Sequence, residues 1–369
     1  MKPEAIIIED GLRSEGLAGS ILQNLDGVKV KTDPRFWLTD VKYLEGDFQS
    51  HMKKVLRLSG RKGGFIRSCP GQRGMLCCSY FVLDTILGCP ADCHYCILQD
   101  VFRDLPITIN VDTDAIFREI QEFLSSRSAF TRIGTGELSD SLLLEDITHF
   151  AERAVTFFST VPGAILELKT KGARVGLLER LDGKGRTVVS MSLAPQHVID
   201  VYESGTASLA ERIESSALCA SWGYPVGFHF DPILLEGDWE GAYTGIVSDL
   251  KEIIDPGNVA WVSMGAFRFT RRLVAVIRER FPGSGLLAGE FVKCSDGKYR
   301  YPFKIRTRAY RLLYEKLKSW SSQFPVYLCM ESPRVWMEMT GESPPSPAGL
   351  SSMLDERAMY LANRSSSLS

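Results

Sequence analysis

The chain has 369 residues, of which 44% are hydrophobic and 24% are charged. These values are typical of a folded globular protein and exclude an intrinsically disordered chain. The formal net charge of −2 gives no overall attraction to nucleic acid, so any binding to a polyanion must depend on local patches.

Residues 1–79 predict a separate α+β extension. They begin Met-Lys-Pro-Glu-Ala-Ile-Ile-Ile-Glu-Asp, where acidic residues follow a short apolar run, and no uncharged apolar stretch in the chain approaches the length of a membrane span. The sequence therefore predicts a cytoplasmic protein without a membrane segment. The nine cysteines are sparse and odd in number, which argues against a disulfide framework and agrees with a reducing compartment.

Residues 80–290 predict a partial barrel. Short β-rich runs alternate there with amphipathic segments of helix length, a pattern typical of parallel strands joined by crossover helices. The expected strands are 80–87, 131–134, 164–168, 187–193, 225–230 and 259–264, and the expected helices include 114–125, 209–222 and 240–254. The predicted fold class is therefore α/β, a partial (β/α)6 barrel of the TIM type with chemistry at the C-terminal ends of the strands.

The chain after residue 290 predicts two smaller parts. Residues 291–341 predict a C-terminal cap made of a hairpin, a helix and a strand. Residues 342–369 are rich in Ser and Pro, which predicts a flexible tail with one helix near 352–361.

Three cysteines lie close together where the strand expected at 80–87 ends. Cys89, Cys93 and Cys96 have C-x3-C-x2-C spacing in the run Gly88-Cys-Pro-Ala-Asp-Cys-His-Tyr-Cys-Ile-Leu-Gln99. This run can supply three thiolates to a [4Fe–4S] cluster with four iron corners, which leaves one iron for a small molecule. The spacing resembles the signature of radical S-adenosylmethionine (AdoMet) enzymes, in which the amino and carboxylate groups of AdoMet chelate that iron.

A structural zinc site is the main alternative for this run. A closed structural zinc site has four ligands, usually as two separated pairs, and these cysteines lack a matching pair. His94 is a fourth candidate ligand, but it lies beside Cys93 inside the loop, where reaching the same metal would strain the backbone. The sequence therefore favours an iron–sulfur cluster over zinc.

A glycine-containing turn follows the strand expected at 131–134. Its Gly136-Glu137 pair resembles part of the Gly-Gly-Glu motif of radical AdoMet enzymes, which meets the amino group of the methionine moiety of AdoMet. The alternative is a strand-to-helix turn in which the glycine has only a conformational role.

The resemblance becomes specific to one family, the spore photoproduct lyases, over roughly residues 80–310. The stretches that carry it are Gly88–Gln99, Leu168-Lys-Thr-Lys171, Ser192-Leu-Ala194, residues 203–213, Gly223-Tyr-Pro-Val-Gly-Phe228 and Phe267-Arg-Phe269. It implies that Tyr95 packs near the adenine of AdoMet and that Ser139 and Asp140 contact AdoMet. It also implies that Lys171 and Ser192 contact the carboxylate or the ribose, against the alternatives of a solvated lysine and a barrel-filling serine.

The sequence departs from the DNA-repairing members of that family at two positions. Those members have a cysteine near the Ser-Asp pair that donates hydrogen to the product radical, and Glu137 occupies its place here. They also have a tyrosine after the last cluster cysteine, where this chain has Ile97. A carboxyl O–H is a much poorer hydrogen-atom donor than a thiol, so thymine-dimer repair by that route is not expected.

A second cysteine group lies outside the three-cysteine run. Cys69, Cys77 and Cys78, together with Cys329, are candidate ligands of a second, auxiliary iron–sulfur cluster. Adjacent cysteines are awkward ligands for one metal, and buried cysteines are common in protein cores. A further alternative is that one of these thiols replaces the missing hydrogen donor.

Two basic stretches are free of acidic residues. The first contains Lys53, Lys54, Arg57, Arg61, Lys62, Arg67 and Arg73, and the second contains Lys298, Arg300, Lys304, Arg306, Arg308 and Arg311. Aromatic residues are interleaved with the second stretch, so cations for phosphates and rings for stacking on bases occur together, as a nucleotide or nucleic-acid site requires. A solvated charged face and core aromatics are the alternative interpretation.

Four residues are candidates for a catalytic role. His229 and Asp231 end the strand expected at 225–230 and should face the mouth of the barrel, where they can orient substrate or transfer protons, or have structural roles. Glu137 and Arg268, the arginine of Phe267-Arg-Phe269, complete the set on the basis of the resemblance.

The predicted function is that of a radical AdoMet enzyme. A reduced [4Fe–4S] cluster would split AdoMet, and the 5′-deoxyadenosyl radical would abstract hydrogen from a nucleotide or a nucleic acid. The electron would come from an external donor such as flavodoxin or ferredoxin. The alternatives are a biosynthetic radical reaction such as sulfur insertion into a small nucleoside, fed by an auxiliary cluster, and a non-catalytic iron–sulfur module that binds nucleic acid, which would have no use for an AdoMet pocket.

Overall fold

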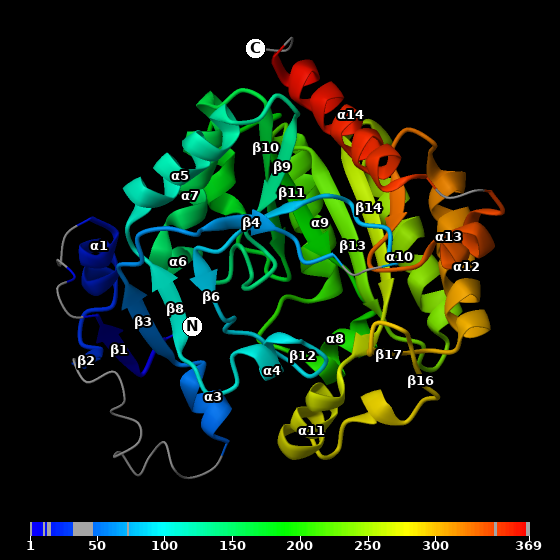
Figure 1. Cartoon of the computed structure of the whole chain (residues 1–369), viewed down its shortest axis with the longest axis horizontal. Coiled ribbons are helices and arrows are strands. Elements are labelled where there is room, and N and C mark those ends of the chain that lie inside the picture. Colours follow the sequence, from blue (N-terminus) through cyan, green and yellow to red (C-terminus); the bar gives the residue numbers. More distant parts are fainter. Residues whose placement is uncertain are drawn as a thin grey trace.

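An eight-stranded sheet is the largest element of the fold (Figure 1). Its strands, in spatial order, are β18 (Val326–Leu328), β14 (Val259–Ala266), β13 (Val226–Ile233), β11 (Thr187–Ser192), β10 (Ala164–Thr170), β9 (Thr131–Gly134), β5 (Phe81–Leu83) and β4 (Ile66–Ser68). Neighbouring strands run parallel from β18 to β5, and β4 is antiparallel to β5. This computed structural model describes residues 2–9, 12, 16–31, 47–71, 74–342 and 345–366.

Helices on the outside of the curled sheet connect its parallel strands (Figure 1). They include α5 (Thr113–Ser125), α7 (Phe150–Thr160), α9 (Leu209–Ser221), α10 (Trp239–Ile253) and α12 (Phe303–Trp320). The side chain of Asp112 caps α5 by accepting a hydrogen bond from the backbone N–H of Ala115 at 3.0 Å. β11 and β14 are buried along their whole length, as expected of parallel strands with both faces covered. The predicted α/β partial barrel is therefore confirmed.

The predicted cap contributes a strand to the barrel itself. Its hairpin is formed by β16 (Val292–Lys293) and β17 (Tyr299–Arg300), and β15 (Arg268–Phe269) pairs with the other side of β17. After α12 the chain enters β18, which extends the barrel sheet beside β14, and then α13 (Pro333–Thr340). The hairpin, helix and strand are present as predicted, but the strand belongs to the main sheet.

The C-terminal region differs from the flexible tail expected from residue 342 onward. α14 (Pro347–Ser366) is a helix of 20 residues that packs against β14. Leu350, Leu354, Ala358 and Leu361 are buried along one of its faces, because their spacing of three or four residues matches the helical repeat. Polar composition masked this apolar stripe in the sequence.

A second sheet joins the N-terminal extension to the barrel. Its order is β2 (Lys29–Lys31), β1 (Ala5–Ile8), β3 (Val55–Ser59), β8 (Ile107–Asn110) and β6 (Ile86–Leu87), with α1 (Gly16–Asn24) and α6 (Glu145–Thr148) nearby. The single strand expected at 80–87 is thus two strands, because the chain leaves the barrel sheet after β5 and enters the second sheet at β6. The extension is continuous with the barrel rather than separate from it.

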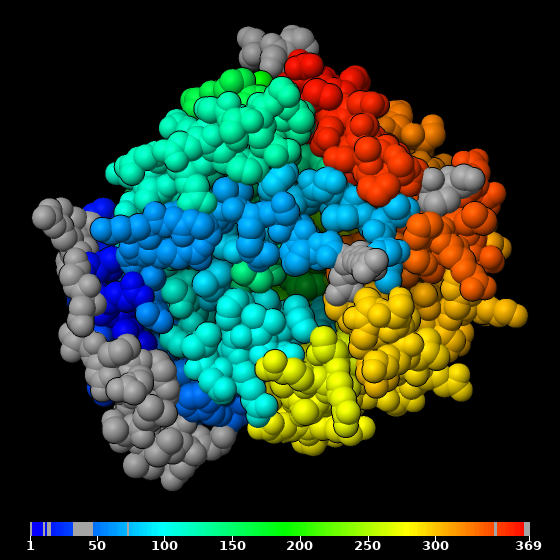
Figure 2. All heavy atoms as spheres, viewed as in Figure 1, coloured from blue at the N-terminus to red at the C-terminus, as the bar shows by residue number. Residues whose placement is uncertain are grey.

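Short elements complete the mouth of the barrel. They are α3 (Phe48–Met52), β7 (Asp92–Cys93), α4 (Leu98–Val101), α8 (Gln196–Tyr202), β12 (Glu203–Ser204) and α11 (Arg271–Arg280). In Figure 2 the blue segment around β4 crosses the visible face, and a hollow lies between it and the cyan and yellow segments that carry α4 and α11. Within the described residues, no helix has the length and apolar character required to span a bilayer.

Candidate active site

The three-cysteine loop lies between β6 and α4, at the C-terminal ends of the barrel strands. Cys93 is buried, and Cys89 and Cys96 are partly exposed. Burial is the main reason why the pKa of each thiol is raised, in Cys89 to about 12. β7 pairs antiparallel with β12, which places Glu203 opposite Cys93. The three thiols therefore occupy one environment on a loop that is fixed at both ends.

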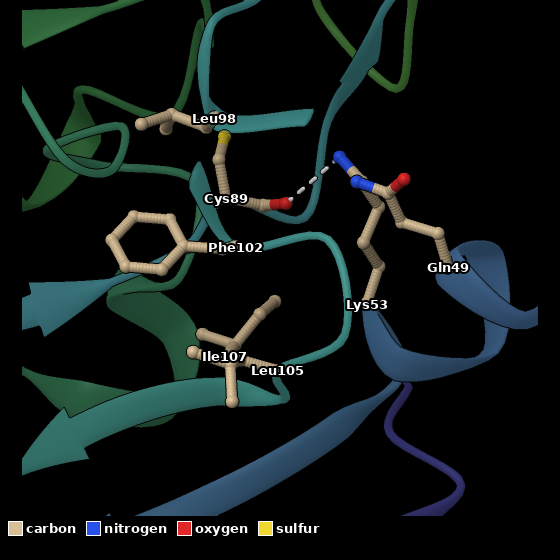
Figure 3. A pocket seen from close by; sticks show the side chains of 8 residues that line it. Gln49, Lys53, Cys89, Leu98, Phe102, Leu105 and Ile107 are labelled. Atoms are coloured by element: carbon tan, nitrogen blue, oxygen red, sulfur yellow. Dashed lines mark hydrogen bonds between the residues drawn. The ribbon is translucent and has the colours of Figure 1, made fainter. Parts of the chain in front are cut away.

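Two basic side chains hold this loop from outside the barrel. Lys53, at the end of α3, donates a hydrogen bond to the backbone carbonyl of Cys89 at 3.3 Å (Figure 3). It also donates to the carbonyl of Ala91, and its Nζ lies 3.2 Å from the carboxylate of Asp92. Arg280 of α11 donates two hydrogen bonds of 2.9 Å to the same carboxylate. Burial alone would raise the pKa of Asp92, but Arg280 and Lys53 lower it to about 2.

The pocket in Figure 3 lies between this loop and the N-terminal sheet. It is lined by Gln49, Lys53, Gly88, Cys89, Leu98, Phe102, Leu105 and Ile107. Lys53 and Gln49 reach it from α3, on the side away from the barrel strands. Apart from Gln49 and Lys53, the side chains around Cys89 in this lining are apolar.

A buried glutamate connects two of the predicted AdoMet-binding residues. Glu203 accepts hydrogen bonds from the hydroxyl of Tyr95 and from Lys171, the latter at 3.0 Å, and it pairs with Arg212 at 2.6 Å. Lys171 Nζ also lies 5.5 Å from the centre of the Tyr95 ring. Burial would raise the pKa of Glu203, but Lys171 and Arg212 lower it to about 2. Arg212 also donates to the carbonyl of Ser192 at 2.8 Å, so this predicted residue belongs to the same network.

The turn after β9 combines a close backbone approach with an unpaired hydroxyl. A Cβ on Gly136 would lie 2.7 Å from Lys169 Cβ and 2.9 Å from its carbonyl oxygen, so only glycine fits without displacement. Glu137 forms an ion pair with Lys169. Ser139 Oγ is buried and has no hydrogen-bond partner among the described residues.

Asp140 has a clear structural role at this turn. Its carboxylate accepts hydrogen bonds from the backbone N–H groups of Leu142, Leu143 and Lys171 and from the hydroxyl of Thr170, at 2.7 to 3.0 Å. These bonds tie the turn to the end of β10. Asp140 therefore positions the turn and Lys171, whether or not it also touches a ligand.

These features fit the cofactors that the cysteine loop implies. Three thiols are the donor set of a [4Fe–4S] cluster with one open iron. The unpaired hydroxyl of Ser139 and the tight glycine at 136 suit a polar ligand that lies against the turn. Across the described parts of the chain, no three His, Cys, Asp or Glu side chains converge as they would around a single metal ion.

The predicted catalytic residues fall into two groups of contacts. His229 is buried, with Nδ1 2.5 Å from Ser263 Oγ and Nε2 2.9 Å from Glu167 Oε1. Asp231 and Arg268 form a two-pronged ion pair with both distances 3.0 Å. Gly265 leaves room for this pair, because a Cβ there would lie 2.7 Å from Asp231 Cγ.

The buried glutamate that holds His229 was not a sequence prediction. Glu167 also accepts hydrogen bonds from Ser190 at 2.5 Å and Trp261 at 2.8 Å. Burial would raise its pKa, yet His229 and the other partners place that pKa well below its usual range. Both ring nitrogens of His229 are thus occupied inside the barrel, whereas the side chains of Arg268 and Asp231 are 17% and 25% exposed. The sequence signal that could have identified Glu167 is a single glutamate within the otherwise apolar strand expected at 164–168.

The second cysteine group lies at the same end of the barrel. The backbone N–H of Leu76 donates to the carbonyl of Glu331 at 3.0 Å, so the segment with Cys77 and Cys78 lies against the segment after β18. Arg268 Nη2 is 3.7 Å from Cys329 Sγ. A hydrogen bond from Cys78 lowers the pKa of Cys77 to about 6, whereas burial raises that of Cys329 to about 12.

Most cations of the two basic stretches are paired with acidic side chains instead of lying open to phosphate. Ion pairs join Lys54 to Glu4, Arg57 to Glu9, Arg67 to Asp84, Arg300 to Asp296, Arg306 to Glu331, Arg308 to Glu240 and Arg311 to Glu338. Tyr301 and Tyr310 are buried rather than available for stacking. Arg73 lies outside the described residues. The sequence did not reveal these pairs, because every acidic partner lies outside its basic stretch or at the border of that stretch.

A curled parallel half-barrel with a three-cysteine loop at its strand ends defines the class of radical AdoMet enzymes. The sequence profile of the family described as spore photoproduct lyase matches residues 77–324. The chain belongs to this family, whose members use a [4Fe–4S] cluster and AdoMet.

Individual relatives agree with this assignment. The spore photoproduct lyase of Geobacillus sp. (strain Y412MC61) is 27% identical over 254 residues, which are 66% of this chain and 73% of the relative. That of Bacillus subtilis (strain 168) is 30% identical over 224 residues, 58% of this chain and 66% of the relative. A solved spore photoproduct lyase complexed with dinucleoside spore photoproduct has a TM-score of 0.76 at 22% identity and covers 89% of this chain and 99% of its own. This structural likeness confirms the fold.

Proposed function

We propose that this enzyme abstracts a hydrogen atom from a nucleotide or nucleic-acid substrate without being a true spore photoproduct lyase. The observation that carries the proposal is the loop of three cysteines at the mouth of a spore photoproduct lyase-type half-barrel, a donor set that would leave one iron of a [4Fe–4S] cluster open. When bound, the cluster supplies the electron that splits AdoMet into methionine and a 5′-deoxyadenosyl radical. The relatives' solved complexes with a dinucleoside photoproduct support a substrate of nucleic-acid type.

The chain's own residues would hold and enclose the reactants. Cys89, Cys93 and Cys96 would ligate the cluster. Ser139 would offer its unpaired hydroxyl to AdoMet, and Lys171, fixed by Glu203, would meet the carboxylate or ribose. Fixed donors of this kind orient a ligand without reorganisation, and the surrounding barrel excludes water from a reactive radical.

The ion pair of Glu137 supports the distinction from a true lyase. Glu137 forms an ion pair with Lys169, and although burial alone would lower the pKa of Lys169, Glu137 and Glu167 raise it. A carboxylate in such a pair carries no O–H, so it has no hydrogen atom to donate. We therefore expect the purified enzyme to leave spore photoproduct unrepaired, and its conversion to two intact thymine residues at a rate comparable to AdoMet cleavage would contradict this.

Anaerobic reconstitution tests the core of the proposal. The iron-loaded protein, given dithionite and AdoMet, should produce 5′-deoxyadenosine. Addition of a DNA oligonucleotide or of nucleotides should raise that yield, with deuterium from a labelled substrate appearing in 5′-deoxyadenosine. A protein that binds zinc and no iron, or that forms no 5′-deoxyadenosine, would exclude the proposal.

Sulfur insertion into a small nucleoside is the second candidate, because four thiols lie near the same mouth. It requires an auxiliary cluster on Cys69, Cys77, Cys78 and Cys329, and therefore about eight irons per chain instead of about four. Iron counting on a Cys89/Cys93/Cys96 triple alanine variant separates the two functions. Residual iron near four per chain favours sulfur insertion, and residual iron near zero excludes that function.

A further inference from the structure

An exposed apolar patch covers the outer side of the cluster loop. Ile97, Val101 and Leu105 have exposed fractions of 42%, 54% and 51%. Ile97 directly follows the ligand Cys96, and the backbone N–H of Val101 donates to the carbonyl of Ile97 at 3.1 Å, so both lie on one helical face. Large apolar side chains that gather on a surface mark a site of contact with another molecule.

Arginines of α11 flank this patch. α11 packs against α4, where Arg272 lies 3.1 Å from Asp100 and Arg103 pairs with Glu279. Arg271, Arg272 and Arg278 are exposed, the side chain of Arg272 by 83%. The Arg280 side chain is 4% exposed and pairs with Asp47 and Asp92, so the surface of residues 97–105 and 271–280 carries four arginines against three acidic residues, whereas the whole chain has a net charge of −2. The surface around the cluster loop is therefore locally basic.

We propose that this surface, α4 with the turn to Leu105 and the exposed arginines of α11, docks an acidic protein that delivers single electrons to the cluster. The inference rests on the proposed function, in which each AdoMet cleavage consumes one electron from outside. Cys96 and Ile97 are adjacent in the chain, so the patch begins one residue away from a cluster ligand. A carrier seated there brings its redox centre close to the acceptor.

The composition of the patch favours an acidic carrier protein over a second copy of this chain or a nucleic acid. An apolar centre with an arginine-rich rim is typical of protein–protein interfaces, and electron-transfer encounters use small ones. A second copy of this chain would bring like-charged arginines together, and a nucleic acid would leave the three apolar side chains without a complementary surface. An acidic carrier protein complements both the charge and the apolar centre.

The helix α11 of the docking surface is also hydrogen-bonded to the cysteine loop. Arg280, on the same helix as the exposed arginines, donates two hydrogen bonds to Asp92, the residue before Cys93. Asp92 is further held by Gln99 at 2.8 Å. The docking surface and the cluster ligands therefore form one rigid unit, which favours fast electron transfer without rearrangement.

A comparison of two electron sources distinguishes a loss of carrier docking from a loss of catalytic activity. Initial rates of 5′-deoxyadenosine formation are measured with dithionite, which needs no docking surface, and with enzymatically reduced flavodoxin or ferredoxin. We expect Val101→Glu and the double variant Arg271→Glu/Arg278→Glu to lower the carrier-driven rate by about tenfold or more and to leave the dithionite-driven rate within about twofold of wild type. The carrier-driven wild-type rate should also fall as salt is raised.

Matched substitutions elsewhere serve as controls. Leu218→Glu on α9 changes an apolar residue with an exposed fraction of 43%, and Lys251→Glu on α10 reverses an exposed charge. Both should leave both rates unchanged. The docking proposal is overturned if the patch variants keep the carrier-driven rate, if they lose both rates equally, or if the wild type accepts electrons from dithionite but from neither carrier. If the wild type forms no 5′-deoxyadenosine with dithionite, the proposed function itself is excluded.

Discussion

The two cysteine groups at the mouth of the barrel differ in chemical state. Burial raises the pKa of all three loop thiols in the same direction. In the second group, Cys77 is acidified to a pKa of about 6 while burial and neighbouring groups raise the pKa of Cys78 and Cys329. The surroundings of the two groups thus differ, because burial dominates at the loop thiols whereas a hydrogen bond between their own side chains dominates at Cys77 and Cys78. Proximity of cysteines therefore does not by itself define a cluster site.

The two groups also differ in how they are supported. The loop is held by Lys53 from α3, by Arg280 from α11 and by β12. The second group is held mainly through its backbone, by the bridge between Leu76 and Glu331, by Arg132 at the carbonyl of Cys78, and by the N–H groups of Cys69 and Cys329, which donate to the carbonyls of Tyr80 and Met264 at 2.8 Å. Left-handed residues follow at Ser79 and Met330, with φ of 56° and 58°. Support from several elements preorganises ligands, so we expect substitutions around the loop to have the larger effects.

The largest expected contrast is between one cysteine of each group. Cys93→Ala removes a proposed cluster ligand, so it should lower dithionite-driven 5′-deoxyadenosine formation by about a hundredfold or more and reduce the iron content. Cys329→Ala, the matched control, should keep both within about twofold. High-performance liquid chromatography of the products and iron analysis provide the measurements. Comparable activity in the two variants would mean that the cluster is assigned to the wrong cysteines.

Sequence patterns predicted the parts of this site that depend on local order. Buried parallel strands are nearly continuous apolar runs, so their positions were readable, and the spacing of Cys89, Cys93 and Cys96 identified the loop. The sequence did not predict which side chains contact the residues of the loop. Glu203 lies far along the chain from Tyr95, and Lys53 comes from a segment interpreted as a separate extension. Such contacts depend on which strands become neighbours, and the split of 80–87 between two sheets has no local signal.

Removal of the Glu203 charge should be the most damaging change to the support of the loop. Glu203→Gln leaves Arg212, whose side chain is fully buried, and Lys171 without their anion, and breaking a buried ion pair costs about 3 to 5 kcal/mol. Denaturant unfolding measures this loss. The control Glu338→Gln breaks a pair with Arg311 in which both side chains are about half exposed, and it should change stability by less than about 1 kcal/mol. Equal effects would show that the Glu203 network contributes little.

The same network predicts a pH dependence. The folded-state pKa of Glu203 is about 2, below the ordinary value of 4.5, so its contribution to stability is complete above pH 4.5 and is lost as pH falls toward 2. The difference in unfolding free energy between wild type and Glu203→Gln should therefore be constant from pH 7 to about 5 and shrink below about pH 4.5. A difference that grew on acidification would contradict the assignment of a depressed pKa.

Lys53 tests the support of the loop without touching a cluster ligand. Lys53→Met removes the hydrogen bonds to the carbonyls of Cys89 and Ala91, and the loss of such outer contacts lowers metal affinity by about tenfold to a hundredfold. Iron release to a chelator under anaerobic conditions should accelerate accordingly. Lys54→Met changes the neighbouring lysine, which is half exposed and pairs with Glu4, and should have no effect. Identical release from both variants would mean that the extension does not hold the loop.

The smallest predicted effect concerns the turn that lies between the two cysteine groups. Gly136→Ala places a methyl group within 2.7 Å of Lys169 Cβ and 2.9 Å of its carbonyl oxygen, and overpacking of this kind costs about 1 to 3 kcal/mol. Because Lys169 pairs with Glu137, the displacement should also weaken AdoMet binding, measured by equilibrium dialysis of the reconstituted protein. Gly176→Ala has no heavy atom within 4 Å of the added carbon and should leave stability and binding unchanged. If AdoMet affinity stays at the wild-type value while Gly136→Ala is destabilised, the turn is a packing feature and the ligand lies elsewhere in the mouth.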